Sequence, residues 1–113
     1  MNRRAFALTF GLGLAALASP QAAWAEDHLA EAVRHTKAAV DHGKQGQAEV
    51  LVTHAESALT HAEAAQKGVY NIHVEQGVSH LKAAIAEGKK SNAQGATEHA
   101  AEALTHLEAA KKK

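Results

Sequence analysis

Histidine is the residue type in this 113-residue chain that is best suited to chemistry, with nine copies at regular spacing. The chain contains no cysteine, which excludes disulfides, thiolate zinc sites and iron–sulfur clusters. Imidazole nitrogen is a good ligand for Cu(II), Ni(II) and Zn(II), and it titrates close to neutral pH. Metal binding and a response to pH are therefore the two kinds of chemistry that the composition favours.

Eight of the histidines form two copies of one pattern, displaced by 45 residues. The first four and their counterparts are His28, His35, His54 and His61, then His73, His80, His99 and His106. The residues around them also match, since 58–61 and 103–106 both read ALTH. The ninth histidine, His42, has Glu87 as its counterpart. Two copies of one structural unit explain this repeat.

Each copy is expected to form a helical hairpin. Within a unit the histidines lie seven residues apart, and apolar residues recur beside them as a continuous stripe of the width that faces a helical core. Glycine-containing segments interrupt the pattern, and a capping box is expected to begin at Ser91. Short connections make neighbouring helices antiparallel. The chain is thus predicted to be all-α, an up-down-up-down four-helix bundle of two duplicated hairpins, with helices near 27–42, 47–66, 72–87 and 92–111.

One helix cannot chelate an ion with its own two histidines. Seven residues of helix rise about 10.5 Å, whereas each ligand of an ion lies about 2.0–2.1 Å from it. A neighbouring helix must therefore supply the second imidazole, in two outer grooves of the bundle. If the four helices follow one another around the bundle in one direction, His35 pairs with His54 and His80 pairs with His99. In the other direction, His54 pairs with His80 and His35 pairs with His99. The sequence leaves both open.

Two carboxylates can assist the imidazoles. Glu31 lies between His28 and His35 in the chain, and Glu102 lies between His99 and His106, so that each is within reach of either imidazole on its helix. The candidate metal ligands are His28, His35, His42, His54, His61, His73, His80, His99, His106, Glu31 and Glu102. We expect them to bind divalent ions, with Cu(II) preferred and Ni(II) and Zn(II) as further candidates.

Residues 1–25 resemble an export signal. A basic start with Arg3 and Arg4 precedes a short apolar run, and 23–25 read AWA, a cleavage pattern that would leave a domain of residues 26–113. The signal fits either twin-arginine or ordinary secretory export, and both imply the periplasm. Cleavage before Glu26 would also create an amino-terminal Glu-Asp-His sequence able to bind Cu(II) or Ni(II) in a square plane.

Other partners and activities have less support. Without the signal the chain carries 10 basic and 12 acidic residues, which gives no case for nucleic acid. We expect a monomer with no stable membrane insertion after cleavage, and no enzyme activity, because the metalloenzyme motifs Glu-x-x-His and His-Glu-x-x-His are missing. The alternatives to metal binding are a pH-responsive helical module and an oligomerising coiled coil in which the histidines bind nothing.

Three segments resemble the small metal-binding protein family. They are 31–35 (EAVRH), 39–46 (AVDHGKQG) and 54–62 (HAESALTHA). The resemblance implies an exported, histidine-rich four-helix protein that binds several divalent ions, copper above all, and buffers metal in the periplasm without catalysis. The chain departs from the family at Gln47, at Glu87 and in its lysine tail, where such proteins tend to carry further histidines.

Overall fold

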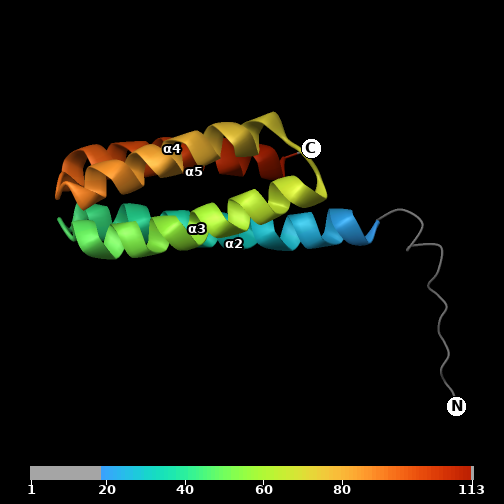
Figure 1. Ribbon diagram of the computed structural model, residues 1–113, viewed down its shortest axis with the longest axis horizontal. Helices are drawn as coiled ribbons and strands as arrows, with labels where there is room; N and C mark the ends of the chain where they lie inside the picture. The colour runs from blue at the N-terminus through green and yellow to red at the C-terminus, as the bar shows by residue number, and fades with distance from the viewer. Residues whose placement is uncertain (1–18, 113) are drawn as a thin grey trace, which may run out of the picture.

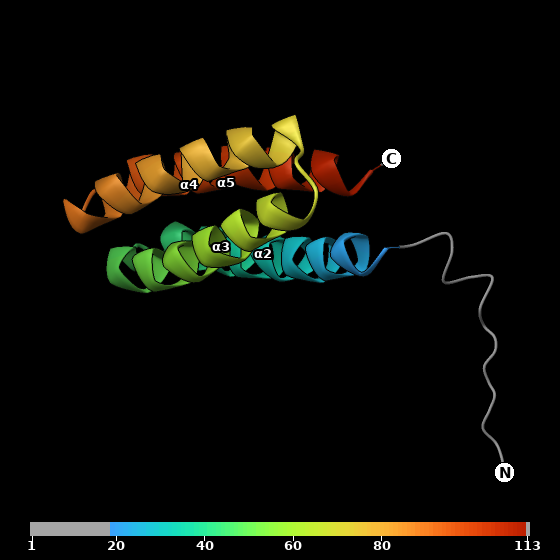
Figure 2. The same ribbon diagram turned by 45° about the vertical axis from the view of Figure 1, so that its right-hand side comes forward.

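Four helices build the part of the chain that the structure, a computed structural model, describes, residues 19–112. They pack as two antiparallel hairpins stacked on each other (Figures 1 and 2). In one layer α2 packs against α3, in the other α4 packs against α5, and the layers meet through α2 with α5 and α3 with α4. The bounds are Pro20–Lys44 for α2, Ala48–Gly68 for α3, Ile72–Lys89 for α4 and Ala93–Lys111 for α5. The predicted all-α four-helix bundle is confirmed.

The first helix begins earlier than the sequence suggests. Ser19 caps α2 by accepting a hydrogen bond from the Ala22 amide at 3.0 Å, and Pro20 occupies the first turn, where its missing amide hydrogen costs nothing. The predicted start near residue 27 is therefore wrong. The export segment stays a prediction, and its residues 1–18 lie outside the described part of the chain. Within residues 19–112, no helix has the length and apolar character needed to cross a bilayer.

Each of the two hairpin turns contains one residue with a left-handed backbone conformation. Gly46 has a φ of 79° in the α2–α3 turn, and Ser91, its counterpart 45 residues later, has a φ of 64° in the α4–α5 turn. The cap of α5 is Asn92, whose side chain accepts a hydrogen bond from the Gly95 amide at 3.1 Å. The capping box predicted to begin at Ser91 is therefore wrong, because Ser91 adopts the left-handed turn conformation and Asn92 caps the helix alone, with Gly95 at the position where a capping box has Glu or Gln.

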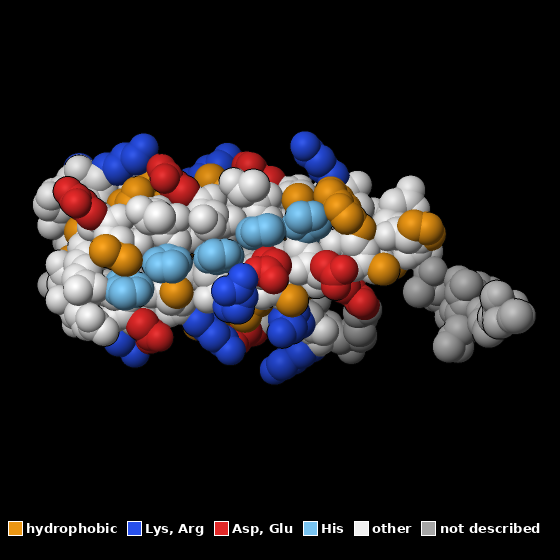
Figure 3. Space-filling view, turned by 90° about the horizontal axis from the view of Figure 1, so that it is seen from below, with side chains coloured by type: hydrophobic (Ala, Val, Ile, Leu, Met, Phe, Trp, Pro, Cys, Tyr) orange, Lys and Arg blue, Asp and Glu red, His pale blue; other side chains and the backbone are white. Residues whose placement is uncertain are grey.

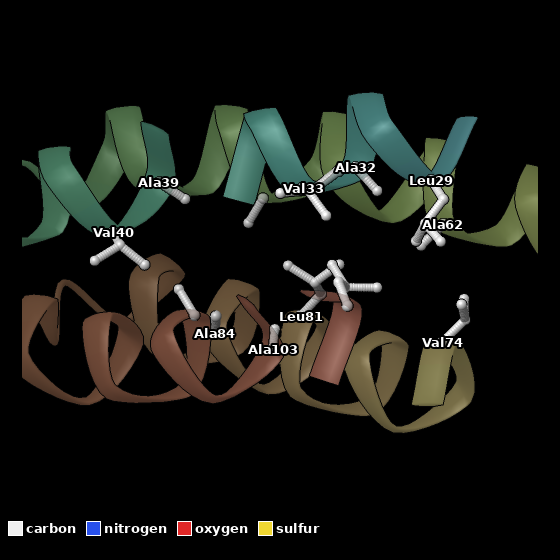
Figure 4. Close-up of a cluster of buried hydrophobic side chains, with 14 of the residues drawn as sticks. Leu29, Ala32, Val33, Ala39, Val40, Ala62, Val74, Leu81, Ala84 and Ala103 are labelled. Carbon is white, nitrogen blue, oxygen red and sulfur yellow. The ribbon is translucent and has the colours of Figure 1, made fainter. Parts of the chain in front are cut away.

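Alanine dominates the core, as the composition of the apolar stripe predicts. More than half of the buried apolar cluster is alanine, and Leu51, Leu81 and Leu107 are its largest fully buried side chains. Figure 4 shows side chains of this cluster pointing from both hairpins into the space between them. Small side chains bring the backbones close together but bury little area per residue, so the core is thin for its length.

Glycines set the distance between the hairpins in a symmetric way. A Cβ on Gly43 would lie 2.1 Å from Oγ1 of Thr97, and one on Gly88 would lie 2.4 Å from Cγ2 of Val52. Gly88 and Thr97 are the counterparts of Gly43 and Val52 in the repeat, so the two layers pack through equivalent contacts. Within the second hairpin, Gly77 of α4 permits the close approach of Leu107 of α5, whose Cδ2 would be 2.7 Å from an added Cβ.

The strained residue in the second turn gives a first prediction. Replacing Ser91 with glycine should stabilise the protein by about 0.5–1 kcal/mol, because a side chain in the left-handed region costs more than the flexibility that glycine adds to the unfolded chain. The urea midpoint measures this change. The reciprocal Gly46→Ser should destabilise, since its added Cβ contacts nothing within 4 Å and only the backbone is affected. A lower midpoint for Ser91→Gly would contradict the assignment of strain.

Candidate metal centres

Five histidines from α2 and α3 form one continuous row, and Figure 3 shows histidines aligned across this face. Their ring centroids lie 5.2, 5.7, 5.8 and 5.3 Å apart in the order His28, His61, His35, His54, His42. The two helices alternate along the row because they are antiparallel. Each histidine of one helix thereby fills the gap of about 10.5 Å that the seven-residue spacing leaves on the other. We call these five residues the first histidine row.

Ligand atoms from the two helices converge most closely at one end of this row. Nδ1 of His28 lies 2.9 Å from Nδ1 of His61, and one nitrogen donates while the other accepts according to the tautomers. The indole ring of Trp24 meets the His28 ring edge-on, with 4.4 Å between centroids. The pair is half-buried. Two imidazole nitrogens thus face one another across a helix interface.

A carboxylate joins the first row at its centre. Ligand atoms of Glu31, His35 and His61 all lie within 4.8 Å of one another, which makes the three a group that could hold a metal ion. Arg34, three residues after Glu31, forms an ion pair with that carboxylate. The hydrogen bond from the Arg34 guanidinium holds the pKa of the Glu31 carboxyl below its ordinary value. Glu31 is therefore ionised at neutral pH, but its charge is shared with a cation.

His35, the central histidine of the first row, favours its neutral form. Burial lowers the pKa of His35 below its ordinary value of 6.5, and the positive charge of Arg34 lowers it further. The rings of His61 and His54 act in the same direction, while Glu31 opposes them. A neutral imidazole keeps the lone pair that a metal ion needs.

A shorter row lies on the second hairpin. The His80 ring of α4 lies between those of two α5 histidines, with its centroid 5.7 Å from that of His99 and 5.4 Å from that of His106. Nδ1 of His80 is 3.4 Å from Nδ1 of His99. We call these three residues the second histidine row. It repeats the middle of the first row, since His35, His54 and His61 are the counterparts of its members.

The second row also has its carboxylate. Oε1 of Glu102 lies 3.1 Å from Nδ1 of His80 and 3.9 Å from Nδ1 of His99, and the three residues form the second group that could hold an ion. Within residues 19–112 no lysine or arginine forms an ion pair with Glu102. The residue three positions after Glu102, where Arg34 stands relative to Glu31, is Thr105, which carries no charge. The two carboxylates therefore differ in how free they are to bind a cation.

The two remaining predicted ligands are His42, at one end of the first row, and His73, which belongs to neither row. His42 stacks on His54 and shares a hydrogen bond of 2.6 Å between its Nδ1 and Oε1 of Gln47. His73 is exposed in the first turn of α4, and within the described chain its ring contacts no other histidine. The repeat thus places equivalent residues differently: His28 is paired with His61, while its counterpart His73 stands alone.

The structure decides between the two pairings that the sequence leaves open. His35 faces His54 and His80 faces His99, so each row belongs to one hairpin rather than to the contact between hairpins. Sequence reasoning missed Arg34, although its position three residues after Glu31 is the spacing of a helical ion pair and could have identified it.

Two rows of imidazoles, each with one carboxylate, on the outside of a four-helix bundle define a helical protein of the metal-binding class. A family model described as small metal-binding protein matches residues 3–110. The chain therefore belongs to the small metal-binding protein family, as the resemblance of its histidine segments indicates. Comparison with curated proteins gives no match.

The lowered pKa of His35 predicts that the metal-free protein loses stability as the pH falls from about 7 to about 5. In the unfolded chain His35 takes up its proton at the ordinary value of 6.5, whereas in the folded chain it does so at lower pH. The unfolded state therefore binds more protons in this window, and protonation favours unfolding. The carboxyl of Glu31, also lowered, adds a second loss below pH 4.5. Urea midpoints measured with a chelator present test both steps.

Two variants separate these contributions. His35→Gln should reduce the fall between about pH 7 and about pH 5 and leave the lower step in place. Arg34→Gln should reduce both steps, because the guanidinium lowers the pKa of both His35 and Glu31. A His35→Gln protein that declines as steeply as the wild type over the upper window would contradict this account of the pH dependence.

Proposed function

We propose that this protein is a periplasmic buffer for divalent transition-metal ions, which binds several of them at once through its two histidine rows. Cu(II) is the preferred ion, with Ni(II) and Zn(II) as further cargo. Binding serves sequestration and tolerance of metal rather than catalysis. Support for each part of the proposal comes from the donor atoms, from their spacing and from the arrangement of the rows.

The observation that carries the proposal is the separation of Nδ1 atoms between His28 and His61. Two nitrogens bound to one ion at about 2.0–2.1 Å stand about 2.9 Å apart when they occupy neighbouring corners of a square plane. The separation in the structure is 2.9 Å. The two nitrogens thus already stand at the separation that neighbouring ligands of one Cu(II) or Ni(II) ion require.

Donor chemistry favours Cu(II) over softer ions. The chain has no cysteine, and its single methionine is Met1. Cu(I) prefers such sulfur ligands, whereas imidazole and carboxylate suit Cu(II), Ni(II) and Zn(II), and the intrinsic affinity order of these ions is highest at Cu(II). A nitrogen- and oxygen-only set of ligands therefore supports Cu(II) as the principal cargo.

The continuity of the first row favours storage over a single rigid site. Its ring contacts overlap, because His61 faces both His28 and His35 and because His54 faces both His35 and His42. An imidazole used in one pair is not free for the next, so five histidines offer two pairs at a time. The second row offers one more pair. We therefore expect about three ions at moderate affinity and weaker uptake beyond that.

Location in the periplasm rests on the amino-terminal segment. Residues 1–25 combine two arginines, a short apolar run and a small-residue cleavage pattern, which together are typical of an exported bacterial protein. The two possible signals differ in route but not in destination. Metal buffering outside the cytoplasm is consistent with a chain that has no thiols to oxidise.

A comparison of repeat counterparts tests the proposed function. His28→Gln should weaken the tightest Cu(II) equivalent at least about tenfold, because it takes one nitrogen from the pair whose Nδ1 atoms lie 2.9 Å apart. The number of equivalents should stay the same, because the four histidines left in the first row still form two pairs. His73→Gln is the matched control and should change uptake little, since the His73 ring faces no other histidine in the described chain. Isothermal titration with Cu(II) at pH 7 measures both, and uptake should fall near pH 5 as protons compete for the imidazoles.

Less than one equivalent of Cu(II) bound by the unmodified protein would overturn the proposed function. Equal losses in the His28→Gln and His73→Gln proteins would contradict the assignment to paired imidazoles, because an exposed single histidine would then bind as well as a facing pair.

A further inference from the structure

The two histidine rows differ in the ligands they offer, although they derive from one repeated unit. In the first row the carboxylate of Glu31 is paired with Arg34, and nitrogen donors predominate. In the second row the carboxylate of Glu102 contacts only imidazoles among the residues that the structure describes. The residue three positions after Glu102 is the uncharged Thr105, whereas the residue three positions after Glu31 is Arg34. A cation approaching the second row meets a free negative charge, and one approaching Glu31 meets a guanidinium as well.

The atoms of the second group are spaced so that they could share one ion. Nδ1 of His80 lies 3.4 Å from Nδ1 of His99, and Oε1 of Glu102 lies 3.1 Å from the first nitrogen and 3.9 Å from the second. A point about 2.1 Å from all three atoms lies just outside their plane, at the ligand distance of Zn(II). Two ligands of a tetrahedral ion at that distance stand about 3.3–3.4 Å apart. The edges of this triangle scatter around that value, whereas the closest pair of the first row, at 2.9 Å, matches a square plane.

Exposure leaves room for a fourth ligand. The side chains of His80, His99 and Glu102 are 30%, 38% and 60% exposed, so solvent reaches the position that the ion would occupy. Two histidines, one carboxylate and one open position form a ligand set that suits tetrahedral Zn(II).

We propose that His80, His99 and Glu102 form a tetrahedral Zn(II) site with one position open to solvent, distinct in its metal preference from the nitrogen-rich first row. This inference rests on the proposed metal-binding function and assigns one ion class to one row. It means that the two hairpins hold different metals at the same time when copper is limiting, with Cu(II) in the first row and Zn(II) in the second.

The internal repeat supplies a reciprocal experiment. Ser57 is the counterpart of Glu102 and follows His54 by three residues, as Glu102 follows His99. Glu102→Ser removes the carboxylate from the second row, and Ser57→Glu adds one beside His35 and His54 in the first. The probe is Co(II), which replaces Zn(II) and absorbs visible light strongly when tetrahedral and weakly when octahedral.

We expect the wild type to bind one Co(II) with strong absorption, and one equivalent of Zn(II) to abolish this absorption. Glu102→Ser should weaken that site at least tenfold, and Ser57→Glu should add a second strongly absorbing equivalent. Far-UV circular dichroism confirms that the variants keep their helices. Weak octahedral absorption in the wild type, or unchanged Co(II) binding by a folded Glu102→Ser protein, would overturn the inference.

Cu(II) titrations of the same proteins separate this inference from the proposed function. If His28→Gln weakens Cu(II) binding but Glu102→Ser leaves Co(II) binding unchanged, the zinc site alone is overturned. Failure of the wild type to bind either ion overturns both.

Discussion

The spacing of seven residues between histidines is the constraint on which the arrangement of ligands depends. On one helix it separates imidazoles by about 10.5 Å, too far to share an ion. In an antiparallel hairpin the same spacing leaves a gap that a histidine of the facing helix fills, and the ring centroids then fall 5.2–5.8 Å apart. The repeated metal-ligand geometry therefore exists only in the folded hairpin, which couples binding to folding.

The alanine-rich core and the histidine rows both depend on a short distance between neighbouring helices. Imidazoles on neighbouring helices meet only if the backbones are close, and small side chains allow that approach, together with Gly68 between α3 and α2 and Gly77 between α4 and α5. The cost is a core with few large residues, among which Leu51, Leu81 and Leu107 are the largest fully buried side chains. A protein of this kind gains stability from the ions it binds, because they bind the folded state and not the unfolded chain.

The sequence predicts the architecture and the candidate ligands because both depend on local periodicity. The apolar stripe, the four helices and the candidate carboxylates follow from heptad positions. The structure confirms the four helices and places Glu31 and Glu102 each beside two histidines. Which neighbouring helices pair their histidines does not follow from the sequence, since a bundle that turns in either direction satisfies the same pattern. The role of Ser91 was also hidden, because a serine in the left-handed region looks like a cap when only its type is known. The unequal surroundings of Glu31 and Glu102 became visible once Arg34 could be placed against its neighbours.

Pulsed electron paramagnetic resonance of the protein at one equivalent of Cu(II) tests the central claim most directly, because it counts the imidazole nitrogens coupled to a single ion. We expect at least two coupled imidazoles, and the loss of one of them in His28→Gln and in His61→Gln should assign the pair to different helices of one hairpin. One coupled imidazole, with water and backbone supplying the other ligands, would contradict the claim that facing helices chelate a shared ion.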